Sequence, residues 1–271
     1  MIDRLPDNHE SPSLIVGRLA AEDGTEAPEA FELKVLVSSE TADAVAEWAA
    51  GAGGLRPDPH ADPASGGCYT TTTLYLDTPA LDVYYRREGF ARRRFRLRRY
   101  GEDGWAHLEC KTKSGDLVHK QRTAVPLAEA SRLAGAHAEN GWAGDWFHGR
   151  IAGRGLLPAS MVTYRRAAFV GSCPEGPLRV TIDRQARSRL CVDPGEWTPR
   201  RVEAGEGVDV LGGSAIVELK YLAALPLPFK TLMKNLTLHP GSVSKYRLGR
   251  EALGSPTPAG AAKGAAECRT G

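Results

Sequence analysis

The sequence has few cysteines, no long apolar run and no excess of one charge. Its five cysteines form no CxxC pair, which argues against a disulfide framework or a zinc site and favours a reducing compartment. No apolar run approaches the roughly 20 residues that span a bilayer, and residues 1–10 lack the pattern of a signal peptide. Because 35 Lys and Arg stand against 33 Asp and Glu, a globally basic nucleic-acid binder is disfavoured. We expect a cytoplasmic protein that does not bind nucleic acid.

Familiar catalytic motifs are also missing. The chain contains no HExxH, GxSxG or P-loop sequence, and its seven histidines have no metal-binding or catalytic spacing. These absences set aside zinc proteases, hydrolase triads and Walker ATPases. Any chemistry must come from how the charged residues are arranged.

Composition divides the 271 residues into three parts. Residues 1–27 are rich in Pro, Asp, Glu, Gly and Ser, and residues 254–271 are rich in Gly, Ala and Pro. We expect a flexible N-terminal segment and a disordered C-terminal tail. Residues 28–253 form one domain without an internal repeat, in which Gly51–Gly67 has the composition of a long surface loop.

Strands dominate the predicted domain. Alternating, β-branched or aromatic segments predict strands at 30–37, 69–77, 92–100, 105–113, 117–125, 161–170, 178–185 and 214–221. Helices are predicted from Ser38 or Ser39 to about Ala50, from Pro126 to 139, and as short elements at 78–85, 226–236 and 244–253. Residues 139–158 are ambiguous. The predicted class is α+β, dominated by an antiparallel sheet.

Charged residues recur at every second position of several strands. Side chains two positions apart share a face of a strand, so each of these strands has one charged and one apolar face. The charged sets are Glu32 and Lys34; Arg94, Arg96 and Arg98; Glu109, Lys111 and Lys113; Glu218 and Lys220. For any single strand, a solvent-exposed face explains the charges. Four such strands instead predict a barrel with helices over its apolar face and charges facing a lumen.

Lysines and arginines that face one another across a lumen repel unless an anion lies between them. A polyanion is the natural partner, because Arg makes bidentate contacts to phosphate and Lys supplies a point charge. The few Glu residues on the same faces suit a hard divalent cation that bridges phosphate oxygens.

Short motifs run in a fixed order through residues 30–250. They are Phe31-Glu32-Leu33-Lys34, Leu74-Tyr75-Leu76-Asp77-Thr78-Pro79, Arg94-Phe95-Arg96-Leu97-Arg98-Arg99-Tyr100-Gly101, Leu108-Glu109-Cys110-Lys111-Thr112-Lys113, Lys120-Gln121-Arg122, Tyr164-Arg165-Arg166-Ala167-Ala168-Phe169, Leu178-Arg179-Val180-Thr181-Ile182-Asp183, Val217-Glu218-Leu219-Lys220-Tyr221 and Ser244-Lys245-Tyr246. In this order they resemble the VTC domain, the polyphosphate polymerase branch of the triphosphate tunnel (CYTH-like) enzymes. Tunnel triphosphatases typically begin with Glu-x-Glu-x-Lys, whereas Ala30 occupies the first Glu position here. This departure favours the VTC branch.

The resemblance implies a fold, a reaction and partners. The implied fold of residues 28–253 is a closed antiparallel β-barrel, the triphosphate tunnel, with helices packed on the outside. The implied enzyme is a metal-dependent phosphotransferase that moves the γ-phosphate of ATP onto inorganic polyphosphate. Mn²⁺ or Mg²⁺ is the implied cofactor, and a membrane-protein partner is also implied.

Charge and facing assign candidate roles within that tunnel. The catalytic candidates are Lys34, Arg96, Arg98, Lys111, Arg166 and Lys220. The substrate-binding candidates are Arg94, Lys113, Lys120, Arg122, Arg179, Ser244 and Lys245. Glu218 is the leading metal ligand, followed by Glu32 and Glu109. Plain surface charge is the alternative for Lys120 and Arg122, and an ion pair with Arg179 is the alternative role for Asp183.

Two other functions remain open on the sequence. One is a tunnel triphosphatase that hydrolyses tripolyphosphate or an organic triphosphate, against which the missing first Glu counts. The other is a non-catalytic polyphosphate or nucleotide-binding domain, against which the presence of Glu218 counts. A channel for single-stranded nucleic acid is disfavoured because the charged rows lack stacking aromatics.

Overall fold

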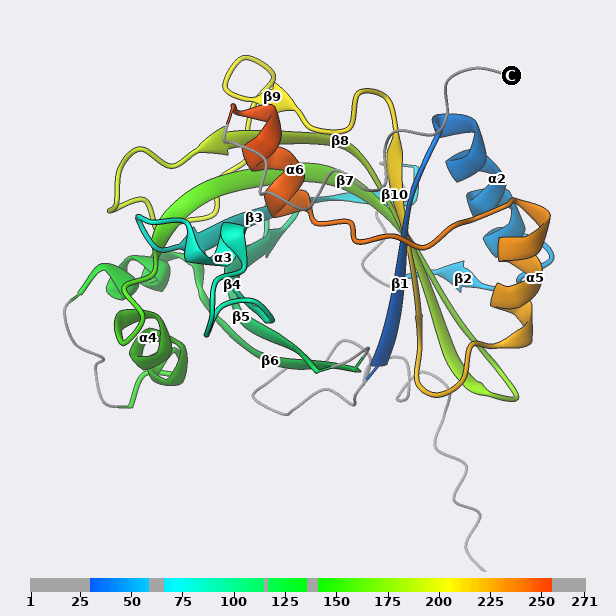
Figure 1. Ribbon diagram of the computed structural model, residues 1–271, viewed down its shortest axis with the longest axis horizontal. Helices are drawn as coiled ribbons and strands as arrows, with labels where there is room; N and C mark the ends of the chain where they lie inside the picture. The colour runs from blue at the N-terminus through cyan, green and yellow to red at the C-terminus, as the bar shows by residue number, and fades with distance from the viewer. Residues whose placement is uncertain (1–29, 59–65, 115–116, 136–140, 255–271) are drawn as a thin grey trace, which may run out of the picture.

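The computed structural model describes residues 30–58, 66–114, 117–135 and 141–254 (Figure 1). The predicted N-terminal segment, the predicted tail after Gly254 and the middle of the predicted loop at 51–67 lie outside these residues. Among the described residues, no helix combines the length and the apolar character needed to cross a membrane.

The described strands form one antiparallel sheet, and all eight predicted strands are present. The strands are β1 (Ala30–Val37), β2 (Arg56–Pro57), β3 (Cys68–Asp77), β4 (Arg93–Tyr100), β5 (Trp105–Ser114), β6 (Leu117–Pro126), β7 (Leu157–Cys173), β8 (Gly176–Leu190), β9 (Val208–Asp209) and β10 (Ala215–Tyr221). The helices are α2 (Ser39–Ala50), α3 (Asp82–Tyr85), the 3₁₀ helix η2 (Leu127–Ala134), α4 (Asp145–Ala152), α5 (Leu227–Asn235) and α6 (Lys245–Ala252). The predicted α+β class is confirmed.

The sheet curls strongly but does not form the fully closed barrel that was expected. Its strand order is β2-β7-β3-β4-β5-β6-β1-β10-β8-β9, and β7 also pairs with β8. Between β6 and β1, the described ladder consists of two residue pairs, Ala30 with Val118 and Phe31 with Leu117. By contrast, β1 pairs with β10 over seven residues from Phe31 to Val37. The seam between β1 and β6 is therefore paired only at the start of β1, and we describe the sheet as a half-barrel.

Two helices cover the convex side of β1, β8 and β10. Ser38 caps α2, as predicted, because its hydroxyl accepts a hydrogen bond from the Thr41 amide at 3.2 Å. Val45 of α2 and Phe229 of α5 are fully buried against the apolar face that includes Val217 and Leu219. Burying these side chains is the main favourable contribution to folding in this layer.

The last helix departs from the prediction that helices pack outside the sheet. Tyr246 of α6 stacks on Tyr75 with ring centroids 5.2 Å apart, and the strand register places Tyr75 opposite Arg96 on the concave face. The Tyr246 hydroxyl donates to Asp77 at 2.6 Å. At Gly249, a Cβ atom would lie 2.5 Å from the Ser188 hydroxyl, so only glycine allows this approach. Helix α6 thus lies against the concave side of the sheet.

Candidate functional site: a cation-rich interior

The strand registers bring the predicted charged rows onto one continuous face. Glu32 pairs with Lys220 and Lys34 pairs with Glu218 between β1 and β10. Between β4 and β5, Arg94 pairs with Lys111 and Arg96 pairs with Glu109. Between β5 and β6, Lys111 pairs with Lys120 and Glu109 pairs with Arg122. Directly opposed residues share a face, so these side chains all lie on the concave side, which we call the interior.

The first cluster of the interior surrounds Glu32 and Glu218. Lys34 lies 2.8 Å from Glu32 and 3.4 Å from Glu218, and Lys220 lies 2.8 Å from Glu218. Lys111 reaches Glu32 at 2.6 Å, although β6 separates their strands. This contact across the intervening strand follows from the curvature of the sheet.

Burial and charge oppose each other in this cluster. Burial and the neighbouring Glu218 raise the pKa of Glu32, but the surrounding lysines lower it more, so the net shift is downward. The pKa of Lys111 falls to about 8, because burial outweighs the attraction of Glu32. Lys220 and Lys34 likewise lower the pKa of Glu218 against the effect of burial. Both carboxylates are therefore ionised near neutral pH, while the Lys111 ammonium is only weakly favoured.

The second cluster places one carboxylate among four cations. Glu109 lies 2.6 Å from Arg96, 2.9 Å from Lys120, 3.7 Å from Arg122 and 3.9 Å from Arg98. Burial would raise the pKa of Glu109, but these cations lower it well below its usual range. Lys120 and Arg122 are half-buried and buried, so the alternative of plain surface charge is wrong. The four cations leave Glu109 poorly suited to hold a metal ion.

The third cluster links β7, β8 and α6. Arg166 donates two hydrogen bonds to Asp183, at 2.6 and 2.7 Å, and Lys245 lies 2.5 Å from the same carboxylate. The alternative that Asp183 pairs with Arg179 is wrong. Arg179 instead lies 2.5 Å from Asp58, a residue within the predicted loop that the sequence interpretation did not identify.

The interior holds more positive than negative charge. Its ion pairs join ten cations to five carboxylates. The cations are Lys34, Arg96, Arg98, Lys111, Lys120, Arg122, Arg166, Arg179, Lys220 and Lys245. The carboxylates are those of Asp58, Asp183, Glu32, Glu109 and Glu218. The side chains of these cations are at most 26% exposed, so water screens the excess poorly and a polyanion would be attracted.

Arg94 lies at the edge of this arrangement. Its guanidinium donates to the carbonyl oxygens of Arg93 and Phe90, at 2.6 and 3.5 Å. Burial lowers the pKa of Arg94, and the positive charges of Arg86 and Arg247 lower it further. Arg86 and Arg247 therefore lie near Arg94. These three arginines extend the positive region beyond the three clusters, although Arg247 also lies 3.9 Å from Glu251.

Ser244 and Lys113 are the two remaining predicted substrate ligands. Ser244 is the N-cap of α6, since its hydroxyl accepts from the Arg247 amide at 3.5 Å, so its oxygen already has a structural partner. The side chain of Lys113 lies outside the described part of the chain.

Two aromatic residues of the interior were missed by the sequence interpretation. Burial raises the pKa of Tyr100, but Arg98 and Arg122 lower it more, to about 7. Burial and Arg122 lower the pKa of His107 to about 3, so this imidazole is neutral near pH 7. Tyr100 ends the arginine-rich motif of β4 but carries no charge near pH 7 in ordinary surroundings, and His107 lies outside the quoted motifs, so alternation of charged residues indicates neither.

A divalent metal would find only part of a site in the protein itself. The described residues contain no group of three or more His, Cys, Asp or Glu side chains placed to hold a metal. Mg²⁺ often uses one or two carboxylates together with substrate phosphates. Glu32 and Glu218 fit that arrangement better than Glu109 does, because their common contact with Lys34 shows that two carboxylates lie close together, whereas Glu109 stands alone among its cations.

Comparisons with known proteins support a family assignment. The family model of the VTC domain matches residues 29–254. No curated protein matches the chain. A candidate adenylate cyclase from Bacillus halodurans is 15% identical, with a TM-score of 0.48 over 81% of this chain and 95% of that chain. The candidate adenylyl cyclase HpAC1 from Hippeastrum, described as having a dominant triphosphatase activity, is 14% identical, with a TM-score of 0.45 over 82% and 95%.

Proposed function

Since the chain belongs to the VTC domain family, we propose that it is a polyphosphate polymerase that transfers the γ-phosphate of ATP onto a growing polyphosphate chain. The interior would receive both the triphosphate of ATP and the end of the chain. The excess of cations over carboxylates on its surface supports this role, because it matches a substrate and a product that are both polyanions.

One observation carries the choice of acceptor. Five interior carboxylates have ion-pair partners, and the pKa values of three of them, Glu109, Glu218 and Asp183, are lowered even though burial alone would raise them. A carboxylate with a lowered pKa is a weak general base for activating water. The terminal phosphate of a polyphosphate chain is already anionic and needs no such base. This favours transfer to phosphate over hydrolysis.

The interior residues would act by positioning and electrostatics. Arg96 and Arg98 would bind phosphate oxygens with their planar guanidinium groups. Lys111 and Lys220 would stabilise the charge that develops on the γ-phosphate. A divalent metal, Mn²⁺ or Mg²⁺, held by Glu218 and Glu32 together with phosphate oxygens, would neutralise further charge.

The proposal includes a location and a partner. We place the protein in the cytoplasm, which rests on its cysteine usage, and we include the membrane-protein partner that the family resemblance implies.

Product analysis tests the proposed function. The purified protein is incubated with millimolar ATP and Mn²⁺, and its products are resolved on a polyacrylamide gel while ADP and orthophosphate are measured. We expect a polyphosphate ladder with ADP in excess of orthophosphate. An Arg165→Gln variant, which changes an exposed residue next to Arg166, is the control and should retain the ladder. Orthophosphate equal to ADP from the first minutes, without a ladder, would instead indicate a triphosphatase.

A further inference from the structure

A second basic pocket lies on the convex side of the sheet, outside the interior. Strand β4 contributes Arg93 and Phe95, and β5 contributes Cys110 and Thr112. The register pairs Arg93 with Thr112 and Phe95 with Cys110. Because successive side chains point to opposite faces, these residues face away from Arg94 and the rest of the interior.

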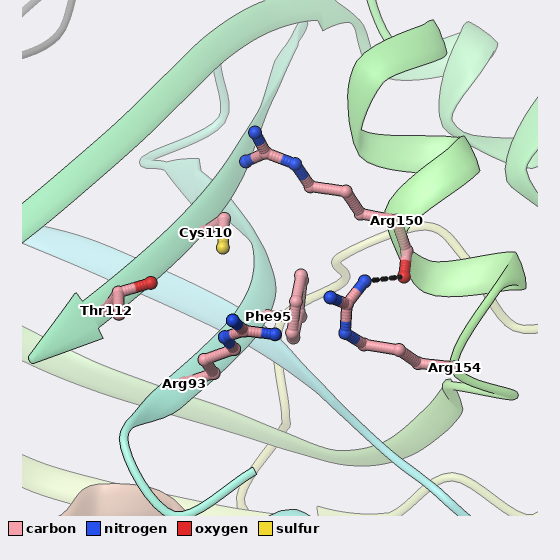
Figure 2. A pocket seen from close by; sticks show the side chains of 6 residues that line it. All are labelled: Arg93, Phe95, Cys110, Thr112, Arg150 and Arg154. Atoms are coloured by element: carbon pink, nitrogen blue, oxygen red, sulfur yellow. Dashed lines mark hydrogen bonds between the residues drawn. The ribbon is translucent and has the colours of Figure 1, made fainter. Parts of the chain in front are cut away.

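Helix α4 and the turn after it complete the pocket. Arg150 comes from the last turn of α4, and Arg154 follows the helix. With the four strand residues they line a cavity of about 320 Å³ (Figure 2). Figure 2 shows the guanidinium groups of Arg93 and Arg154 on either side of Phe95, while that of Arg150 extends toward Cys110. The volume lies at the lower end of the range for small-ligand sites.

The positive charge of this pocket is offset by carboxylates even less than that of the interior. None of the six described lining residues is acidic. Arg150 donates to the Gln121 side-chain oxygen at 2.6 Å, and Arg154 donates to the Arg150 carbonyl at 2.9 Å, both of which are neutral acceptors. Within the described residues, Arg93 has no carboxylate within ion-pair distance. Three neighbouring guanidinium groups without an anion repel one another, so binding an anion relieves the repulsion.

Aromatic contacts hold two of the guanidinium groups in place. Arg154 lies over the Phe95 ring, 5.6 Å from its centroid, and Arg150 lies over the Trp146 ring at 5.1 Å. These contacts restrain long side chains before any ligand arrives, which lowers the entropy cost of binding. Burial raises the pKa of the Cys110 thiol, so a neutral thiol rather than a thiolate would face an incoming anion.

We propose that this pocket binds a linear anion of three or more phosphate groups, as a site separate from the interior. Three guanidinium groups and the Thr112 hydroxyl match more phosphate oxygens than one orthophosphate offers. A linear run of three phosphate groups occurs both in an inorganic phosphate chain and in a nucleoside triphosphate. The inference does not rest on the proposed polymerase activity, because it concerns residues to which no role in the interior is assigned.

Calorimetric titration without metal tests the pocket. Tripolyphosphate, ATP and orthophosphate are titrated into the wild-type protein, an Arg93→Gln/Arg150→Gln variant and an Arg96→Gln variant. The control is Lys230→Gln/Lys234→Gln, which removes the same charge from exposed positions on α5. We expect the pocket variant to weaken one tripolyphosphate site at least tenfold, while Arg96→Gln and the α5 control retain that site. Orthophosphate should bind at least tenfold more weakly than tripolyphosphate.

The ATP titration distinguishes the two sources of the triphosphate group. Loss of an ATP site in the pocket variant would assign the pocket to triphosphate groups in general, whereas loss of a tripolyphosphate site alone would assign it to inorganic chains. Tripolyphosphate binding that the pocket variant leaves unchanged would overturn the proposal. An equal loss in the α5 control would overturn it too, because the effect would then follow net charge. Failure of Arg96→Gln to change any site would count against the interior and leave the pocket result intact.

Discussion

Arg166 and Asp183 face each other across the β7–β8 ladder and are joined by two hydrogen bonds of 2.6 and 2.7 Å. Lys245 at the start of α6 binds the same carboxylate at 2.5 Å. All three side chains are buried. One aspartate therefore holds together two strands and the last helix, and it neutralises only half of the charge that it contacts.

Asp183→Asn should destabilise the protein. The change leaves Arg166 and Lys245 buried without a carboxylate, which typically costs about 3–5 kcal/mol. Urea unfolding followed by circular dichroism measures the effect. Asp43→Asn is the control, because Asp43 forms an exposed ion pair with Arg184 and should cost about 1 kcal/mol or less. An Asp183→Asn cost no larger than that of the control would contradict this account.

Lys111→Met should reduce activity strongly while the fold persists. Met keeps much of the side-chain length but removes the charge, and Glu32 retains Lys34 as a partner at 2.8 Å. Since burial already disfavours the Lys111 ammonium, we expect a melting temperature equal to or above that of the wild type. Loss of one charged phosphate contact corresponds to about 10- to 100-fold in kcat/KM. Lys234→Met, on the exposed face of α5, should behave like the wild type. Near-normal turnover by folded Lys111→Met would exclude this lysine from the site.

Glu218→Gln should separate metal-dependent turnover from phosphate binding. Gln retains an oxygen but loses the charge that a hard cation prefers, so turnover with Mn²⁺ should fall about 100-fold. Removing a negative charge increases the positive excess of the interior, so metal-free tripolyphosphate binding should stay the same or strengthen. Steady-state rates and calorimetry give the two readouts. Glu47→Gln on the exposed side of α2 is the control. Full turnover by the wild type in EDTA would refute the metal assignment.

Tyr100 should ionise near neutral pH. Its pKa is about 7 because Arg98 and Arg122 favour the phenolate more strongly than burial opposes it. Raising the pH from 6 to 8 should therefore increase the absorbance near 295 nm, where the phenolate absorbs. A Tyr100→Phe variant should lack this titration step. Tripolyphosphate should move the step to higher pH, because a nearby anion disfavours a phenolate. The measurement is a spectrophotometric titration with and without the ligand. An identical titration curve for Tyr100→Phe would show that the phenol is not ionised in this range.

The sequence predicted the strands well because each long strand has a simple alternating pattern. Strand β7 extends beyond the predicted 161–170 at both ends, because Leu157 still pairs with Asp77 of β3 and Cys173 with Gly176 of β8. The predicted helix from Pro126 begins only at Leu127 and is a 3₁₀ helix, because Pro126 still pairs with Trp105 in the sheet. Strands β2 and β9 have two residues each, and only their distant partners define them.

The candidate site was predictable in its cations and less so in its carboxylates. Alternation alone places Lys34, Arg96 and Lys220 on the interior face. No local pattern indicates that Asp58 reaches Arg179 or that Glu109 is shared among four cations, because both arrangements depend on the curvature of the sheet. The full closure of the barrel was overestimated for the same reason.

The register of the sheet determines when its parts can form during synthesis of the chain. Strand β1 forms its long ladder with β10, in which Phe31 pairs with Tyr221, and α6 follows β10 in the chain. Pairing between such distant segments slows folding, because closing the long stretch of chain between them costs conformational entropy before any native contact compensates for that cost. During synthesis, Glu32 and Lys34 emerge long before Glu218. The complete interior is therefore one of the last parts of the protein to form, and a chain that ends before residue 245 would lack Lys245 and the whole of α6.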